Sequence, residues 1–181
     1  MAITSPQQLL ALKLQHIQDA ETEAMGLLEE IRGQVQDDQL LQAIRMRMDE
    51  GRSVLEGVRN AMPKADGQAG ADMQNKAARG IIQEARTLMS EIEDPDMKEA
   101  VAIGSIQSLE HYCIATWGTV KALARQMGEQ QVVEVMERAL ASGKQLDGQL
   151  TEIAESRVNP EAMHSQGGQG AGAQDGQQPQ A

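Results

Sequence analysis

One short pattern, Ile-Gln-x-x-Glu, occurs twice and places a glutamate in the middle of an expected helix each time. The copies run from Ile17 to Glu21 and from Ile106 to Glu110. In four-helix bundles that bind two metal ions, two helices each supply one glutamate, and the other two each supply a Glu-x-x-His pair. Glu21 and Glu110 fit the single-glutamate positions. The alternatives are a chance repeat and two surface glutamates that are solvated or ion-paired.

The Glu-x-x-His pairs that such a site also needs are missing. Asp49 stands first in one candidate position, but Arg52 stands where the histidine is required, and a guanidinium has no lone pair to offer a metal. The last expected helix carries Asp147 without a histidine at that spacing. The one literal match, Glu161 to His164, follows Pro160, and we interpret it as accidental.

The elements that must position these carboxylates are helices. Apolar residues recur at steps of three and four, and the core has to be built from aliphatic residues and eleven methionines, with no phenylalanine. The sequence therefore predicts an all-α protein, an antiparallel four-helix bundle with one additional short helix. The expected helices run from Pro6 to about Gly33, from Asp37 or Asp38 to Met62, over roughly 73–92, from Pro95 to Met127, and from about Glu129 to Val158.

Capping residues and helix breakers define the expected boundaries. Ser5 can cap the first helix, Asp94 with Pro95 gives a stop and a restart, and Gly128 ends the fourth helix. Residues 63–72 form a connector rich in Gly, Ala and Asp, and Pro160 is expected to break the last helix. We therefore expect a bundle domain over residues 1–159 and a disordered Gly/Gln-rich tail over 160–181.

Charge and composition exclude several classes of function. The net charge of -11 repels nucleic acids and anionic membrane surfaces, so neither is an expected partner. The apolar segments are interrupted by charges, and the first residues lack the pattern of a secretory signal. The single cysteine, Cys113, cannot form an internal disulfide, and we expect a cytoplasmic protein. No nucleotide-binding loop, nucleophile triad or zinc spacing is present in the sequence.

Several stretches resemble the YciF-like family of ferritin-like bacterial stress proteins. The most specific is Leu109–Val120, which is similar to the family's Glu-His-Tyr-Glu-Ile-Ala motif and the Tyr-Gly-Thr-Leu that follows it. Three further stretches, Asp19–Glu21, Gly80–Ala85 and Leu146–Ala154, are similar to other family motifs. The resemblance covers about residues 6–158 in the same helix order. It implies a ferritin-like bundle, usually dimeric, with a di-metal carboxylate centre and a role in stress response.

The chain departs from the family at positions that would bind metal. Asp49 and Arg52 replace a glutamate and a histidine, Cys113 replaces the second glutamate of the fourth-helix motif, and Arg79 stands where the family has glutamate. On the fifth helix an acidic run becomes the segment 141–144, Ala-Ser-Gly-Lys, although the downstream aspartate is kept. Cys113 is a soft ligand by chemistry, but we interpret it as a small buried structural residue.

Four carboxylates remain as residual metal candidates, and they need compensating positive charge if they face inward. Either a metal ion, iron or manganese, or the guanidinium of Arg52 could supply it, and we hypothesise that Arg52 has taken the metal's electrostatic place. The residual candidates are Glu21, Asp49, Glu110 and Asp147.

Three functions remain open. The broken ligand set favours a non-catalytic structural or interaction module without catalytic residues or a cofactor, acting as a homodimer with an unknown protein partner. The surviving carboxylates favour an enzyme or storage protein that handles peroxide, oxygen or iron at a reduced di-metal site. The methionine-rich apolar faces fit a helical partner-binding or export adaptor, if an apolar patch is exposed.

Overall fold

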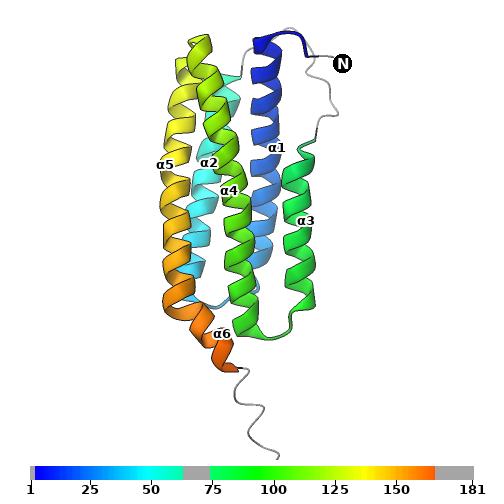
Figure 1. The fold of residues 1–181 in the computed structure, drawn as a ribbon, viewed down its shortest axis with the longest axis vertical. Helices are drawn as coiled ribbons and strands as arrows, with labels where there is room; N and C mark the ends of the chain where they lie inside the picture. Colours follow the sequence, from blue (N-terminus) through cyan, green and yellow to red (C-terminus); the bar gives the residue numbers. More distant parts are fainter. Residues whose placement is uncertain (1–2, 63–73, 166–181) are drawn as a thin grey trace, which may run out of the picture.

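The computed structural model describes residues 3–62 and 74–165, and it shows an all-α bundle (Figure 1). Five long helices account for most of this part of the chain, and two short helical segments follow the fifth. The elements are α1 (Pro6–Arg32), α2 (Asp38–Ala61), α3 (Lys76–Glu91), α4 (Pro95–Met127), α5 (Gln130–Ile153), the π-helical turn η1 (Ala154–Val158) and α6 (Asn159–Ser165).

Polar residues at the helix starts explain most of the boundaries. Ser5, Asp37, Asn75 and Asp94 each accept, through a side-chain oxygen, a hydrogen bond from the backbone N–H three residues later. The fourth helix ends at Gly128, whose φ of +75° is left-handed. The predicted caps of α1, α2 and α4 and the predicted stop at Gly128 are therefore confirmed. The predicted start of the third helix, at residue 73, lies outside the described residues, and the helix begins at Lys76.

Four helices form an antiparallel bundle in the cyclic order α1–α2–α5–α4. In Figure 1 the chain runs down along α1, up along α2, down along α3, up along α4 and down along α5, so every neighbouring pair in this ring is antiparallel. The shorter helix α3 packs against α1 and α4 on the outside of the ring. The predicted bundle with an additional short helix is confirmed.

The core of the bundle is aliphatic and includes several methionines. Met48, Met89 and Met136 are buried, whereas Met46 and Met163 are among the exposed large apolar side chains. The exposed methionines lie on different elements, α2 and α6, so they do not support a single methionine-rich docking face in the described residues. Within residues 3–62 and 74–165, every helix falls short of the apolar length that a bilayer crossing requires.

The predicted helix break at Pro160 is wrong. The helical path continues through η1 into α6, and the side chain of Ala162 is fully buried. In an α-helix a proline lacks the N–H donor, and its ring collides with the carbonyl four residues earlier. Here a wider π turn precedes Pro160, in which the Asn159 N–H donates to the Ala154 carbonyl. The wider turn moves the preceding carbonyls away from the proline ring. The bundle therefore extends past 159, and the rest of the tail predicted over 160–181, residues 166–181, lies outside the described residues.

Candidate functional site

Two buried glutamates meet a buried arginine at the middle of the bundle. Glu21 comes from α1, Glu110 from α4 and Arg47 from α2, and their side chains are 0%, 1% and 3% exposed. The Arg47 Nη1 and Nη2 atoms donate to the Glu21 Oε2 and Oε1 atoms at 2.9 and 3.2 Å. The Arg47 Nε atom donates to Glu110 Oε2 at 2.5 Å. This Glu21–Arg47–Glu110 triad joins three helices by charge-assisted hydrogen bonds.

The register of α2 brings Arg47 inside. Steps of four and three along the buried side of α2 lead from Ile44 through Arg47 and Gly51 to Val54, so the arginine occupies a core position between apolar neighbours. The prediction from sequence assigns the compensating charge to Arg52 and overlooks Arg47. A strict count of threes and fours would have found it.

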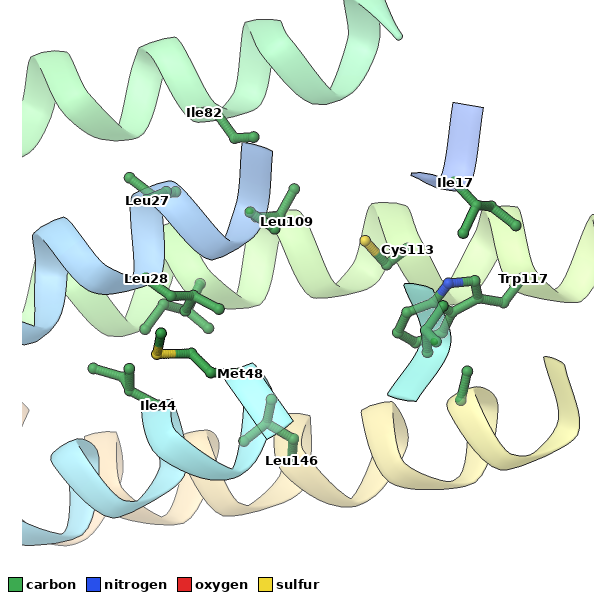
Figure 2. Close-up of a cluster of buried hydrophobic side chains, with 14 of the residues drawn as sticks. Ile17, Leu27, Leu28, Ile44, Met48, Ile82, Leu109, Cys113, Trp117 and Leu146 are labelled. Carbon is green, nitrogen blue, oxygen red and sulfur yellow. The ribbon is translucent and has the colours of Figure 1, made fainter. Parts of the chain in front are cut away.

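An aromatic ring and a thiol complete the surroundings of the guanidinium. The Arg47 Cζ atom lies 5.6 Å from the ring centroid of Trp117, close enough for a cation–π interaction, and Arg47 Nη2 lies 3.8 Å from Cys113 Sγ. Figure 2 shows Cys113 and Trp117 one helical turn apart on α4, both directed into the bundle. Burial raises the pKa of the Cys113 thiol well above its ordinary value, so the thiol is kept neutral and unreactive.

Two glycines make room for the glutamates. A Cβ atom on Gly51 of α2 would lie 3.1 Å from Glu21 Oε2, and a Cβ atom on Gly143 of α5 would collide with Glu110 Oε1. The two halves of the bundle thus repeat one arrangement, in which a glutamate packs against a glycine on the helix that directly follows its own in the chain, α2 after α1 and α5 after α4. One turn before each glycine the halves differ, because the first half has Arg47 and the second has Ala139, which is fully buried.

One arginine therefore serves two carboxylates. Burial by itself lowers the pKa of Arg47, but the charges of Glu21 and Glu110 outweigh it and raise that pKa well above its ordinary value. Burial raises the pKa of Glu110, and the guanidinium only partly offsets this effect. Glu110 Oε1 is buried and has no hydrogen-bond partner among the described residues. The triad is thus short of one positive charge when both carboxyls are ionised.

The remaining predicted site residues lie elsewhere. Asp49 and Arg52 form an ion pair at 2.5 Å on the surface of α2, with side chains 73% and 59% exposed. The hypothesis that Arg52 compensates the inner carboxylates is therefore wrong, because positions 49 and 52 lie on the outer side of α2. Asp147 is partly buried on α5, where it accepts from Gln107 Nε2 at 3.0 Å and contacts His111 Nε2 at 3.1 Å.

The described residues do not fit the di-metal centre that the resemblance implies. Arg47 bonds both inner carboxylates, so a cation already lies where a bridging metal would have to bind. Asp49 cannot join them from the surface, and no group of three or more Asp, Glu, His or Cys side chains suited to a metal occurs in residues 3–62 and 74–165. Metal binding by Glu21 or Glu110 stays a prediction, without support from this donor set.

Comparisons with known proteins agree with the fold. The chain is 27% identical over 143 residues to protein YciF of Escherichia coli K12, covering 79% of this chain and 86% of that protein. The crystal structure of the E. coli stress protein YciF superimposes with a TM-score of 0.78 at 24% identity and covers 87% of this chain and 99% of YciF.

A second solved structure is about as similar. YcfI of Rhodopseudomonas palustris, a candidate structural protein, gives a TM-score of 0.75 at 27% identity, with 82% of this chain and 94% of that chain covered. The model of one protein family, described as a domain of unknown function (DUF892), matches residues 5–163. That match spans nearly all of the helical bundle, and the chain therefore belongs to the DUF892 family.

Proposed function

We propose that this chain is a ferritin-like stress-response protein whose metal site is degenerate, and that it acts as a non-catalytic structural or interaction module. One observation carries the proposal: the Arg47 guanidinium bonds Glu21 and Glu110 at the place where a metal-binding bundle concentrates its carboxylates. An arginine stays protonated, so it supplies a permanent positive charge and no redox chemistry. In this role the triad fixes the relative positions of three helices.

The relatives support this assignment. One of them is the E. coli stress protein YciF, and another is a candidate structural protein of R. palustris. The proposal keeps the homodimer that the resemblance implies and the cytoplasmic location expected from the single cysteine. Light scattering coupled to size-exclusion chromatography tests the homodimer, because a monomer at micromolar concentration would contradict it.

Elemental analysis of the untagged protein, after growth with added iron and manganese, tests the proposal. We expect only background metal in the wild type. The matched control is Arg52→Ala, which removes an exposed arginine from the same helix and should also leave background metal. About two metal ions per wild-type chain would overturn the proposal.

The alternative is a di-iron or di-manganese protein that handles peroxide, oxygen or iron with a reduced ligand set. The observation that favours it is the burial of two converging carboxylates, Glu21 and Glu110, on different helices. This alternative requires Arg47 to leave the carboxylates. It therefore predicts that wild-type protein loaded with iron consumes peroxide or oxidises ferrous iron, whereas the structural proposal predicts neither activity above that of the buffer.

A further inference from the structure

An apolar groove lies between α3 and α4 on the outside of the bundle. The helix α3 packs against α1 and α4, at the outer edge of the bundle in Figure 1. The groove has a volume of about 670 Å³, and Ile81, Leu88 and Val101 are the large apolar residues that line it. The leucine is 38% exposed, so this part of the surface leaves apolar area in contact with water.

Two glycines of the groove have no packing role within the described chain. Gly80 of α3 and Gly104 of α4 are exposed helix residues, and a Cβ atom added to either would meet nothing within 4 Å. By contrast, Gly51 and Gly143 make room for the inner glutamates. Glycine inside a helix weakens it, but it lets a second helix approach the backbone closely. The two glycines therefore favour a groove that receives another helix.

The polar groups of the groove restrict what can cover it. The Ser108 Oγ atom donates to the Gly104 carbonyl oxygen at 2.9 Å, so this hydroxyl already has a partner within α4. Glu84 is the one charged residue in the lining. Within the described residues the ion pairs of α3 are made by Arg79 and Arg86, so Glu84 has none there. An occupant must therefore bring a positive charge to Glu84 as well as apolar surface.

The same side of α3 supplies that positive charge when the occupant is a second copy. Lys76 and Glu84 stand four residues before and after Gly80, so all three lie on one side of the helix. Like Glu84, Lys76 is exposed and forms no ion pair with any residue that the structure describes. When two α3 helices cross antiparallel at Gly80, Lys76 of each copy lies opposite Glu84 of the other. Both ion pairs form together, which is the self-complementarity that a two-fold interface requires.

We propose that two copies of this chain pair through the groove between α3 and α4, with their α3 helices antiparallel and crossing at Gly80. The inference rests on the homodimer of the proposed function and adds which surface forms it. Apolar contact at Ile81 and Leu88 stabilises the pair, and the ion pairs between Lys76 and Glu84 set its register.

Sedimentation equilibrium of the full-length chain measures the Kd of the dimer. Glu84→Lys should raise the Kd about tenfold or more, because two pairs of lysines then face each other across the interface. Lys76→Glu should have a similar effect, because it makes glutamates face each other. The double variant, Lys76→Glu with Glu84→Lys, exchanges the two charges and should return the Kd to within about threefold of the wild-type value.

A side chain at Gly80 separates the interface from the fold of the single chain. Because the new side chain of Gly80→Leu starts in open space, circular dichroism should show unchanged helix content. The Kd should still rise about tenfold or more, because the two helices can no longer approach closely. The matched control is Gly148→Leu on α5, where a Cβ also meets open space, and it should leave the Kd unchanged.

A second control and the wild-type mass make the outcome decisive. Glu56→Lys makes the same charge change on the exposed side of α2 and should leave the Kd unchanged. A wild-type dimer whose Kd is insensitive to Glu84→Lys or Gly80→Leu would overturn the inference and leave the homodimer standing, as would a charge exchange that fails to restore pairing. A monomeric wild type would overturn both and leave the groove to a different partner. The metal analysis is independent of all these results.

Discussion

Replacing Arg47 with alanine removes the positive charge that both inner glutamates contact. Three hydrogen bonds to the glutamates disappear, and two carboxylates that are at most 1% exposed are left without their shared cation. Breaking a buried ion pair by removing one partner costs about 3–5 kcal/mol, because the remaining charge is uncompensated. The free energy of unfolding of Arg47→Ala should therefore fall by about that amount at pH 7.

Protonation gives an independent estimate of the same loss. A carboxyl with an ordinary pKa of about 4.3 needs roughly 3.7 kcal/mol to become neutral at pH 7, at 1.36 kcal/mol per pH unit. At pH 5 the same step needs only about 1 kcal/mol. The variant can relieve its buried charge by taking up a proton, so the stability lost relative to wild type should shrink as the pH falls from 7 to 5.

Urea denaturation followed by far-UV circular dichroism and by tryptophan fluorescence measures this loss. Trp117, the one tryptophan of the chain, lies over Arg47 and so reports on the site directly. The control is Arg52→Ala, whose exposed pair with Asp49 should be worth at most about 1 kcal/mol. A neutral variant, with Arg47→Met and both inner glutamates changed to glutamine, should recover most of the stability, because removing all members of a buried charge cluster is often neutral.

The result that refutes this reasoning is specific. If Arg47→Ala loses less than about 1 kcal/mol, or no more than Arg52→Ala, the buried carboxylates have another source of compensation. A loss that does not change between pH 7 and pH 5 would show that lost packing, rather than uncompensated charge, dominates the effect.

Three further changes test other parts of the structure. Gly143→Ala should lower the free energy of unfolding, measured by urea denaturation, by about 1–3 kcal/mol, because its Cβ would lie 2.8 Å from the buried indole of Trp117. The control is Gly148→Ala on the same helix, whose Cβ meets open space, and it should be neutral or stabilising. Asn75→Ala removes the side chain that caps α3 and bonds α1 and α4. Amide hydrogen exchange should therefore accelerate in α3 and not in α5. Equal acceleration in all helices would show that Asn75 does not hold α3 locally. The hydrogen bond from Arg79 lowers the pKa of Asp19 below its ordinary value of 3.8. The ionised Asp19 therefore stabilises the fold above that ordinary value, and this stabilisation is lost as the pH falls through the lower folded pKa. The stability advantage of wild type over Asp19→Asn should shrink below about pH 4, and an advantage that grows there would be inconsistent with the lowered pKa.

Local chemistry made most of the fold predictable. Capping by Ser5 and Asp94 and the left-handed stop at Gly128 act within a few residues of the chain, so their effects can be recognised from sequence. The continuation through Pro160 could not be, because it depends on a π turn and on the burial of Ala162 against the rest of the bundle. Such tertiary contacts override the ordinary preference of proline to end a helix.

The site was predictable in part. The repeated pattern around Glu21 and Glu110 placed both glutamates in mid-helix, and the need for a compensating charge pointed to an arginine on the second helix. Arg52 matches a ligand position by its spacing from Asp49, but its side chain lies on the surface of α2. Helix periodicity decides which side chain faces inward, and it favours Arg47.

The contact between the α1–α2 turn and the last helical segments affects how the protein is made. Asp37, which caps α2, is paired with Arg157 of η1, and its backbone N–H donates to Glu99 of α4 at 2.8 Å. A growing chain therefore contains Asp37 long before it contains the arginine that pairs with it. Until the final turns leave the ribosome, this end of the bundle lacks its closing contacts, and the nascent protein depends on the rest of the core to stay collapsed.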